Sequence, residues 1–492
     1  MTNASMTDTA IERQTRLIQA VRTALGEKAV VTDPDDIAPW LDDWRGRYHG
    51  ASAAILSPDT TEGVATIVRL AGEFGVPLVP QGGNTSMVGG ATPPADGSAL
   101  ILSLRRMNRI RSINPAAKLA VVEAGVILET LHDAVNAQGM RFPLTLGARG
   151  SATIGGLTAT NAGGTQVLRF GTMRSLVAGI EAVLPDGAIH DGLAALKKDN
   201  RGYDLTHLLV GAEGTLGVVT AVTLRLVPAV HDRATGWLAV ESPAAALKAL
   251  RVMEARSGSA IESFELVPKI ALDLVLQHIP GTRPPFAGAH SWLVLVDYVS
   301  QSGGDGPAQA ALEDLMQGVL ATGLAQDGVV AASEAQAAAF WRLRDSISEA
   351  ERAEGPTMAH DISVPVDAMP DFMLHAAAQV EAAFPGVHAS AFGHLGDGNV
   401  HFHVNAPRGV DAARWRAEVG EPASHMVYDL VVAAGGSISA EHGIGQMKRG
   451  ELARLSSPAR MAALRAIKTG LDPHGLMNPG KLLALAESPS AP

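Results

Sequence analysis

Residues 80–93 read PQGGNTSMVGGATP and follow the short apolar run VPLV. The loop holds four glycines and three hydrogen-bonding residues, namely Gly82, Gly83, Gly89 and Gly90 with Asn84, Thr85 and Ser86. Glycines let backbone N–H groups crowd around an anion, and hydroxyl and amide side chains add further hydrogen bonds. The pattern is neither GxGxxG nor a Walker A loop, because no GK[ST] is present. By itself, it fits a glycine-rich surface loop as well as an anion-binding loop.

Two further loops of the same kind follow along the chain. They read LTLGARGSATIGGLTATNAGG over 144–164 and GYDLTHLLVGAEGTLGVVTAVTLRL over 202–226. Three glycine-rich loops in one stretch indicate a single extended ligand that lies along the backbone. A dinucleotide has the length that such a ligand needs.

Short β-rich runs alternate with these loops and predict an α+β fold. We expect strands at 53–58, 76–81, 99–104 and 119–125, with a helix at 60–75. From Ala229 the sequence pattern changes, and we expect strands at 239–243 and 291–299 and helices at 243–258 and 306–323. This alternation predicts a second α/β layer, and the stretch from Ala440 to Lys481 reads as helix-rich.

The N-terminal residues predict an amphipathic helix. We expect one face to carry Ile11, Leu17, Ile18, Val21 and Leu25. No apolar core follows a basic start, and no run approaches about 18 uninterrupted apolar residues, so a signal peptide and a membrane span are not indicated. These features predict a soluble cytoplasmic protein without a membrane span.

Composition excludes several classes of function. The 492 residues carry a formal net charge of −11 and no Lys/Arg run, which excludes a nucleic-acid partner. The chain has no cysteine, which excludes disulfides, thiolate zinc sites, iron–sulfur clusters and cysteine nucleophiles. Any metal must therefore be bound by His, Asp, Glu or Asn.

Residues 394–404, HLGDGNVHFHV, hold three histidines around a Gly-Asp-Gly turn. The turn can close a hairpin that brings His394 and His401 together across paired strands. His403 lies two residues after His401 and points to the same face. Asp397 is most simply a turn former. With Glu441 of SAEHGIG (439–445), two histidines and a carboxylate form a common zinc or manganese ligand set.

The three loops together resemble a known family. PQGGNTSMVGG, GSATIGG…NAGG and GAEGTLGVVT are similar to the FAD-binding domain of the vanillyl-alcohol-oxidase type flavoproteins. The C-terminal SAEHGIGQMKR…DPHGLMNPGK resembles the D-2-hydroxyacid dehydrogenase branch of that superfamily, closest to D-2-hydroxyglutarate dehydrogenase. The resemblance runs from about residue 35 to 485. It implies a two-part FAD-binding domain, an α/β substrate or cap domain and a helical C-terminal segment.

The resemblance divides the chain into four parts. They are an N-terminal helical segment (1–46), the FAD-binding domain (47–228), the substrate domain (229–438) and a C-terminal segment (439–492) that returns to the FAD domain.

The resemblance also implies which residues bind FAD, with 82–86 cradling the pyrophosphate and Glu213 and Val219 near the adenosine end. The full set is Pro80, Gly82, Gly83, Asn84, Thr85, Ser86, Gly89, Gly150, Ser151, Thr153, Gly155, Asn161, Gly163, Glu213, Gly217, Val219 and Asn478. Some relatives attach the flavin to a histidine in the first glycine loop. That loop has no histidine here, so we expect non-covalent FAD.

The family's metal and catalytic positions fall on the histidine motifs. By resemblance His394, His401 and Glu441 bind a divalent zinc or manganese ion, and His442 is the catalytic base. A metal can bind the substrate hydroxyl and one carboxylate oxygen, while neutral His442 accepts the hydroxyl proton. The C2 hydride then passes to flavin N5. The implied reaction is oxidation of D-2-hydroxyglutarate to 2-oxoglutarate.

The substrate anchor is implied by WRLRDSISEA (341–350), which points to Arg344 and Ser348 for the substrate carboxylate. The next segment, TMAHDISVP (357–365), departs from the family. Relatives usually carry lysine where this chain has Ala359, and many have asparagine where it has His403. Both positions belong to the expected substrate pocket, so these departures affect the identity of the substrate more than the reaction.

Several alternatives stay open. The chain can be a D-lactate or other D-2-hydroxyacid dehydrogenase of the same fold, a metal-dependent hydrolase that uses His394, His401 and Glu441, or a flavin-binding protein without activity. The glycine loops argue against the hydrolase, because hydrolysis needs no dinucleotide. We expect an electron-transfer flavoprotein or a quinone as electron acceptor, and a homodimer.

Overall fold

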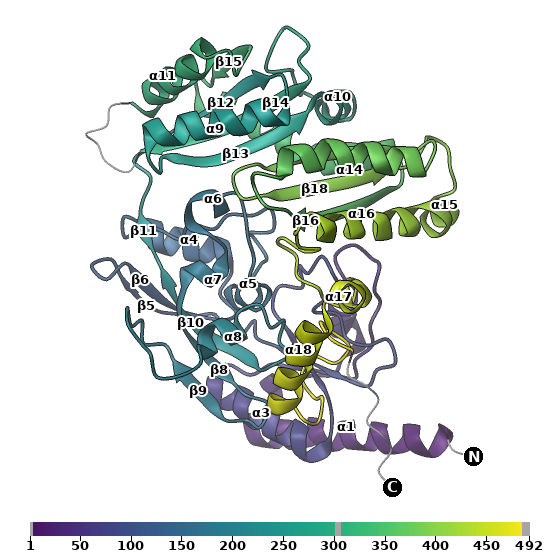
Figure 1. The fold of residues 1–492 in the computed structure, drawn as a ribbon. Helices are drawn as coiled ribbons and strands as arrows, with labels where there is room; N and C mark the ends of the chain where they lie inside the picture. Colours follow the sequence, from purple (N-terminus) through teal and green to yellow (C-terminus); the bar gives the residue numbers. More distant parts are fainter. Residues whose placement is uncertain (1–2, 301–306, 485–492) are drawn as a thin grey trace. The chain divides into compact units, whose positions relative to one another are not determined.

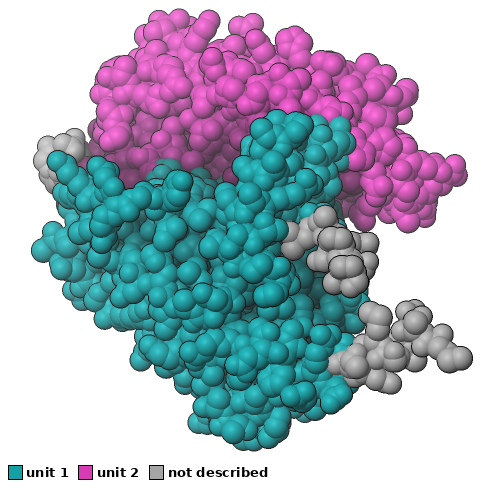
Figure 2. All heavy atoms as spheres, turned by 60° about the horizontal axis from the view of Figure 1, so that its bottom comes forward, with its two compact units in different colours: residues 1–164, 171–228, 441–492 teal, residues 165–170, 229–440 magenta. Residues whose placement is uncertain are grey.

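The computed structural model describes residues 3–300 and 307–484, and it divides into two compact units (Figures 1 and 2). Unit 1 comprises Met1–Gly164, Gly171–Pro228 and Glu441–Pro492. Unit 2 comprises Thr165–Phe170 and Ala229–Ala440. The architecture mixes helices and sheets in both units, as the sequence predicts.

Unit 1 contains a four-stranded sheet with a βαβ crossover. The strand order is β1 (Val30–Val31), β2 (Ile55–Leu56), β4 (Leu100–Ser103) and β3 (Leu78–Gln81), and β4 pairs in parallel with both β2 and β3. Helix α3 (Thr61–Phe74) connects β2 to β3; it begins at the capping side chain of Thr60 and ends at Gly75 in the left-handed conformation. The predicted strands and helix in this region are therefore confirmed, with shorter strands.

An antiparallel five-stranded sheet completes the core framework of unit 1. Its order is β5 (Ile110–Asn114), β6 (Leu119–Glu123), β10 (Val218–Arg225), β8 (Val177–Val183) and β9 (Ile189–Gly192). The remaining elements are η1 (Glu27–Ala29), α2 (Pro34–Ile37), η2 (Ala38–Trp40), α4 (Leu128–Asn136), β7 (Met140–Arg141), α5 (Ile154–Thr160), α7 (Met173–Leu176), α8 (Leu205–Leu209), β11 (Val227–Pro228), α17 (Arg449–Leu455) and α18 (Pro458–Leu471).

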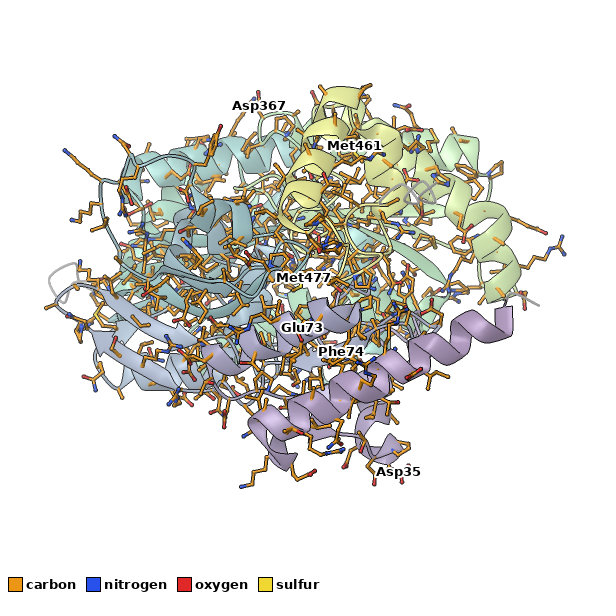
Figure 3. All side chains as sticks on the ribbon, turned by 90° about the horizontal axis from the view of Figure 1, so that it is seen from below. Asp35, Glu73, Phe74, Asp367, Met461 and Met477 are labelled. Atoms are coloured by element: carbon orange, nitrogen blue, oxygen red, sulfur yellow. The ribbon has the colours of Figure 1, made fainter. Side chains whose placement is uncertain are left out.

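Helix α1 (Asn3–Leu25) runs along α3, and Figure 3 shows Phe74 at the end of α3. Leu17 and Val21 are fully buried against that helix, and the guanidinium of Arg16 lies 5.1 Å from the Phe74 ring centre. The predicted amphipathic face is wrong at Ile11, which is 59% exposed. Since α1 has 23 residues and α3 only 14, α3 does not cover the whole length of α1.

Unit 2 is built on one antiparallel seven-stranded sheet. Its order is β15 (Asp327–Val330), β12 (Asp232–Val240), β14 (Trp292–Ser300), β13 (Ile261–Pro268), β17 (His388–His394), β18 (Asn399–Asn405) and β16 (Thr357–Ser363). Its helices are α6 (Val167–Phe170), α9 (Pro243–Ser257), α10 (Lys269–His278), α11 (Ala308–Ala321), α12 (Glu334–Asp345), α13 (Ile347–Glu354), α14 (Met369–Ala383), α15 (Ala412–Trp415), the π-helix η3 (Arg416–Gly420) and α16 (Glu421–Ala433).

The two faces of the β17–β18–β16 end of this sheet differ in polarity. Helices α14 and α16 pack against these strands, and the buried residues on their side are apolar, such as Val400, Phe402 and Val404. The alternate residues of β18 are Asn399, His401 and His403, which face the other way. Histidine and amide side chains gathered on one face mark this end of unit 2 as a candidate site.

Two details differ from the sequence predictions. The strand expected at 239–243 is the end of β12, because the Ser242 side chain caps α9 and the helix starts at Pro243. Residues 165–170, expected in the FAD domain, group with unit 2, since Arg169 pairs with Glu262 and Leu168 lies against Gly396. Among the described residues, no helix is long and apolar enough to cross a membrane.

Candidate functional site

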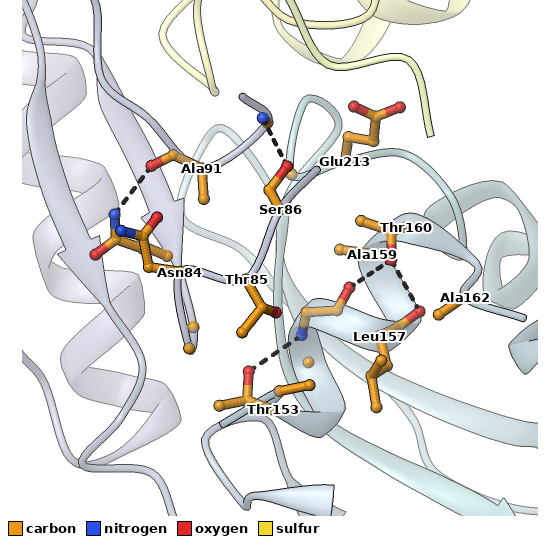
Figure 4. Close-up of a pocket in the computed structure, with 18 of the residues that line it drawn as sticks. Asn84, Thr85, Ser86, Ala91, Thr153, Leu157, Ala159, Thr160, Ala162 and Glu213 are labelled. Atoms are coloured by element: carbon orange, nitrogen blue, oxygen red, sulfur yellow. Dashed lines mark hydrogen bonds between the residues drawn. The ribbon is translucent and has the colours of Figure 1, made fainter. Parts of the chain in front are cut away.

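Unit 1 contains a cavity of about 720 Å³ lined by all three glycine-rich loops (Figure 4). Such a volume lies within the range of small-molecule and cofactor sites. The walls combine loop backbone with hydroxyl and amide side chains and a mainly apolar surface. The cavity therefore suits a ligand with both anionic and flat apolar parts.

The first loop can approach the second only because its residues Gly82 and Gly83 have no side chain. A Cβ added at Gly82 would lie 2.1 Å from Thr153 Oγ1, and a Cβ at Gly83 would lie 1.9 Å from the Ser151 carbonyl oxygen. Either contact is far inside van der Waals distance. The glycines of PQGGNTS are thus required by the close packing of the two loops, which forms one wall of the cavity.

Hydrogen bonds fix both loops around the cavity (Figure 4). Ser86 Oγ accepts the backbone N–H of Gly90 at 2.9 Å. Thr153 caps α5 by accepting the backbone N–H of Gly156 at 3.4 Å. Polar groups with internal partners keep a loop in one conformation, so the cavity wall is formed in advance of a ligand.

The third loop anchors the C-terminal motif. The buried carboxylate of Glu213 accepts the backbone N–H groups of Ile444 and Gly445, each at 2.7 Å. Asn478 Nδ2 donates to the carbonyl oxygen of Glu213 at 2.6 Å and to that of Gly90 at 3.0 Å. Burial raises the pKa of Glu213, although these backbone donors oppose the rise. The contacts place Glu441 and His442 on the cavity wall.

Most residues predicted to bind the cofactor line this cavity. They are Pro80, Gly82, Gly83, Asn84, Thr85, Ser86, Ser151, Thr153, Gly155, Gly163, Glu213, Gly217, Val219 and Asn478. FAD has the length and mixed polarity that this wall suits, and the glycine cradle fits a group that approaches the backbone closely.

Three other predicted positions, Gly89, Gly150 and Asn161, are not among the residues that line the cavity. Gly89 is buried and its carbonyl oxygen accepts the side chain of Gln446 at 3.0 Å. Asn161 ends α5 in the left-handed conformation, and its side-chain oxygen accepts the Thr172 hydroxyl at 2.9 Å. Gly150 is exposed in the turn before Ser151. Gly89 and Asn161 hold their loops in place through these hydrogen bonds, and the contact of all three residues with FAD stays a prediction.

Sequence reasoning missed the apolar part of the cavity wall. This part includes Trp44, Met87, Leu104, Leu146, Leu157 and Leu209. Leu146 and Leu157 belong to the second glycine-rich loop, Met87 to the first and Leu209 to the third, but the six side chains follow no common spacing. Apolar residues in a sequence are ordinarily core residues, so only the fold reveals that these face a cavity.

In unit 2, β17 and β18 form the predicted hairpin around Gly-Asp-Gly. Asp397 Oδ1 accepts the backbone N–H of Asn399 at 2.9 Å, which confirms its predicted role in the turn. The registers pair His394 with Asn399 and His401 with Phe392, so the two histidines are diagonal neighbours. Their ring centres are 5.4 Å apart, and one nitrogen from each lies within 4.8 Å of the other. This pair can bind one divalent ion from two sides.

The surroundings of His401 favour its neutral form. Burial, together with the charges of Arg344 and His394, holds the pKa of His401 well below its usual range. Asp361 lies directly across from His401 on β16 and is itself buried. A neutral imidazole keeps a lone pair for a metal, and the nearby carboxylate adds negative charge that attracts a cation.

A buried carboxylate that the sequence reasoning missed connects two predicted residues. Glu265, on β13, is 0% exposed and lies beside His394 in the sheet register. Its Oε1 is 2.6 Å from His394 Nδ1, and its Oε2 accepts Arg344 Nε at 2.8 Å. Burial acts to raise the pKa of Glu265, but the charges of His394 and Arg344 outweigh it and hold the pKa well below its ordinary value.

The remaining predicted substrate residues occupy different surroundings. His403 is buried, and its Nδ1 makes a short contact with the buried carboxylate of Glu351. Ala359 is the cross-strand neighbour of His403. Ser348 is exposed on α13, and Arg344 belongs to the preceding helix α12. The two helices are separated by Ser346 alone.

Several buried polar atoms near this face have no hydrogen-bond partner among the described residues. They are Ser390 Oγ, Asn399 Oδ1, Asn405 Nδ2 and Glu351 Oε1. Buried polar groups in native proteins are nearly always paired with protein, water or a ligand. The unpaired atoms lie on or beside the strands that carry His394, His401 and His403, which supports a polar ligand at this face.

Comparison with known proteins agrees with this arrangement. Residues 52–192 match the family described as FAD binding domain, and residues 230–482 match FAD linked oxidases, C-terminal domain. A p-cresol methylhydroxylase structure superimposes with a TM-score of 0.72 at 16% identity and covers 96% of this chain and 97% of the other. At that identity, the likeness shows the fold alone.

Curated relatives are more similar in sequence. D-2-hydroxyglutarate dehydrogenase of Xanthomonas citri pv. viticola is 37% identical over 96% of this chain and 98% of the relative. Mitochondrial D-2-hydroxyglutarate dehydrogenase of Arabidopsis thaliana is 35% identical over 93% and 80%. A putative mitochondrial D-lactate dehydrogenase of Schizosaccharomyces pombe is 32% identical over 92% and 85%.

The family matches and the cavity define an FAD-binding oxidoreductase. Within that class, the chain belongs to the FAD linked oxidases, in the family of the D-2-hydroxyglutarate dehydrogenases.

Proposed function

We propose that this protein oxidises D-2-hydroxyglutarate to 2-oxoglutarate with bound FAD and a divalent metal ion. The observation that carries the proposal is the polar face in unit 2, where His394 lies beside His401 and shares the Glu265 carboxylate with Arg344. The names of the two relatives at 35% and 37% identity support this substrate.

The metal ligands in this proposal are His394, His401 and Glu441. Two imidazole nitrogens and one carboxylate oxygen suit zinc or manganese and leave positions open for a substrate. The spacing of the histidine pair supports the first two ligands. Glu441 is the first residue of unit 1 after the chain leaves unit 2, and its place in SAEHGIG supports it as the third. A bound ion would lower the pKa of the substrate hydroxyl and stabilise the alkoxide charge that develops.

The substrate's C1 carboxylate is assigned to Arg344. Its Nε is occupied by Glu265, which leaves the two Nη groups to form a bidentate pair with a carboxylate. The guanidinium lies 5.3 Å from the Phe392 ring centre, and this stacking limits its rotation. Ser348 stays a prediction for the same carboxylate, and its exposed position gives that prediction no support.

Proton removal is assigned to His442. It lines the FAD cavity, and the contacts of Glu213 with Ile444 and Gly445 fix the backbone just after it. A histidine with an ordinary pKa is partly neutral at physiological pH, so it can accept the hydroxyl proton. Bound FAD would accept the C2 hydride at N5.

The proposal includes four further properties of the protein that are predicted from the sequence. They are non-covalent attachment of FAD, an electron-transfer flavoprotein or a quinone as acceptor, a homodimer and a cytoplasmic location. The absence of histidine from PQGGNTSMVGG supports the first.

A second candidate function is the oxidation of a D-2-hydroxyacid with a neutral side chain, such as D-lactate. One observation favours it. The cross-strand neighbour of His403 is Ala359, where relatives usually carry lysine, and His403 itself is held by the carboxylate of Glu351. A second substrate carboxylate would then lack the lysine partner at this place, and burying an unpaired charge is costly.

The metal and base assignments are tested on purified protein. We expect one zinc or manganese ion per chain by elemental analysis, and we expect His394→Ala to lose it while the flavin spectrum is retained. His442→Ala should keep both FAD and metal and lose turnover. Retained metal in His394→Ala would contradict the ligand set, and turnover by His442→Ala would contradict its role as base.

A further inference from the structure

Glu265 is a fully buried carboxylate whose two oxygens accept three directed hydrogen bonds. Besides His394 and Arg344, it accepts the hydroxyl of Ser263 at 2.7 Å. All three partners are within 2.6–2.8 Å, and two of them are residues assigned above to the metal and to the substrate. No sequence motif singles out ESFELVP (262–268), so this residue adds a function to the site.

A second buried carboxylate on the same strand gives a comparison. Glu262 is 2% exposed and also meets two arginines, Arg169 at 3.4 Å and Arg233 at 3.5 Å. These are longer and less directed contacts, and neither partner belongs to the proposed site. Buried ion pairs alone are weak evidence of a functional role, so the difference between Glu262 and Glu265 matters.

The contact with His394 decides which nitrogen is left for a metal. Because a carboxylate can only accept, Nδ1 carries the proton in this contact, so a metal-bound, neutral His394 ring would present its lone pair on Nε2. A histidine that binds metal through one nitrogen usually donates the other N–H to a carboxylate or carbonyl, which fixes the ring and makes it a stronger ligand. Glu265 occupies that position for His394.

The contact with Arg344 decides how the guanidinium is presented. Its Nε donates to Glu265, so the opposite edge with the two Nη groups is the one available for a substrate. One rigid carboxylate on the central strand β13 therefore sets the orientation of both a metal ligand and a substrate anchor. Any shift of Glu265 would move both groups together.

We propose that Glu265 is a positioning residue that holds His394 with Nε2 toward the metal and Arg344 with its Nη edge toward the substrate carboxylate. The inference rests on the proposed function of this face and deepens it. It assigns no contact between Glu265 and the substrate, the flavin or the metal. Its effect is exerted through the orientation of the two side chains that it binds.

The test compares Glu265→Gln with the matched control Glu262→Gln, which alters a buried carboxylate on the same strand. Glu265→Asp is a second variant, since it keeps the charge but is too short to hold both partners at once. Zinc affinity is measured by competition with a chromophoric chelator on the flavin-loaded protein. Flavin content and the kcat and KM for D-2-hydroxyglutarate are measured on the same samples.

Loss of such an outer-shell carboxylate typically weakens metal binding by about 10–100-fold, so we expect this loss in both Glu265 variants. We also expect a raised KM, with flavin content unchanged and Glu262→Gln like the wild type. Zinc affinity within about twofold of the wild type in a folded Glu265 variant would overturn the proposal. An equal loss in Glu262→Gln would also overturn it, because the loss would then follow from general destabilisation. A wild-type protein that takes up no zinc would instead refute the proposed metal site itself.

Discussion

Glu213 and Gly445 are 232 residues apart in the sequence, yet the Glu213 carboxylate accepts the Gly445 backbone N–H at 2.7 Å. The same carboxylate accepts the N–H of Ile444. Glu213 itself has a left-handed backbone with φ +51°, an uncommon conformation for a residue other than glycine. The contact joins the third glycine loop to the C-terminal motif that carries Glu441 and His442.

Glu213→Ala should therefore loosen this motif. The change leaves two backbone N–H groups without their acceptor, and each unsatisfied buried donor costs about 1–3 kcal/mol. We expect the free energy of unfolding to fall by about 2–5 kcal/mol, and turnover to fall more than flavin content. Chemical denaturation and visible spectra measure both quantities. The exposed Glu73→Ala serves as control, and a Glu213→Ala variant as stable and active as this control would refute the anchor.

Gly83→Ala should close the wall of the FAD cavity. The added Cβ would lie 1.9 Å from the Ser151 carbonyl oxygen, so the first and second loops must separate. We expect purified Gly83→Ala to carry less than a tenth of the wild-type flavin, as measured from the visible absorbance per chain. Gly72→Ala, at an exposed helical position with free space around it, should keep its flavin. Full flavin occupancy in Gly83→Ala would show that the cradle is not needed.

Ala359→Lys should favour a substrate with a second carboxylate. The register places residue 359 across from His403 and on the same face as the site. A hydrogen bond to a charged group contributes about 1.5–3 kcal/mol, so we expect KM for D-2-hydroxyglutarate to fall by about tenfold or more. KM for D-lactate should not fall.

The matched control is Ala359→Met, which has a similar length without charge. Steady-state kinetics with both acids checks the prediction. If KM for D-2-hydroxyglutarate is unchanged or higher in Ala359→Lys, then the missing lysine has no anchoring role in this chain.

Lys481 should make stability depend on pH above neutrality. Burial, with the charge of Arg449, lowers the pKa of Lys481 to about 8 in the folded protein, whereas an unfolded lysine has a pKa of about 10.4. Between these values the unfolded chain binds more protons, so the contribution of Lys481 to stability increases with pH. Below pH 8 Lys481 stays protonated in the folded protein, and the burial of this charge lowers the free energy of unfolding.

Lys481→Met should remove this dependence. We expect the stability of the wild type relative to the variant to rise between about pH 8 and 10, measured by urea denaturation at several pH values. The exposed Lys197→Met is the control. A wild-type-to-variant difference that stays constant with pH would contradict the lowered pKa.

Much of the fold could be predicted because its signals are local. The helix at Thr61–Phe74 has a capping threonine and a terminal glycine, and the His394–His401 hairpin has a Gly-Asp-Gly turn. The strand predicted at 239–243 was right only at its first two residues for an equally local reason, since the apolar run ends at Val240 and Ser242 then caps the next helix. Ile11 failed because the helix that would cover it is too short.

Some residues of the candidate site could likewise be predicted from local sequence signals, and others could not. The glycines of the first loop could be found because close backbone approach demands them. Glu265 could not be found, since it lies on a strand 129 residues before His394, and only the sheet register brings the two together.

We propose that this protein is a flavin dehydrogenase that oxidises D-2-hydroxyglutarate with the help of a metal ion. The most direct measurement is an anaerobic titration of the purified yellow protein with D-2-hydroxyglutarate, D-lactate and D-malate, each with and without a chelator. We predict that D-2-hydroxyglutarate bleaches the flavin absorbance at the lowest concentration, that the chelator abolishes bleaching, and that added zinc or manganese restores it. If none of these acids reduces the flavin of the yellow protein, the proposed dehydrogenase activity is wrong.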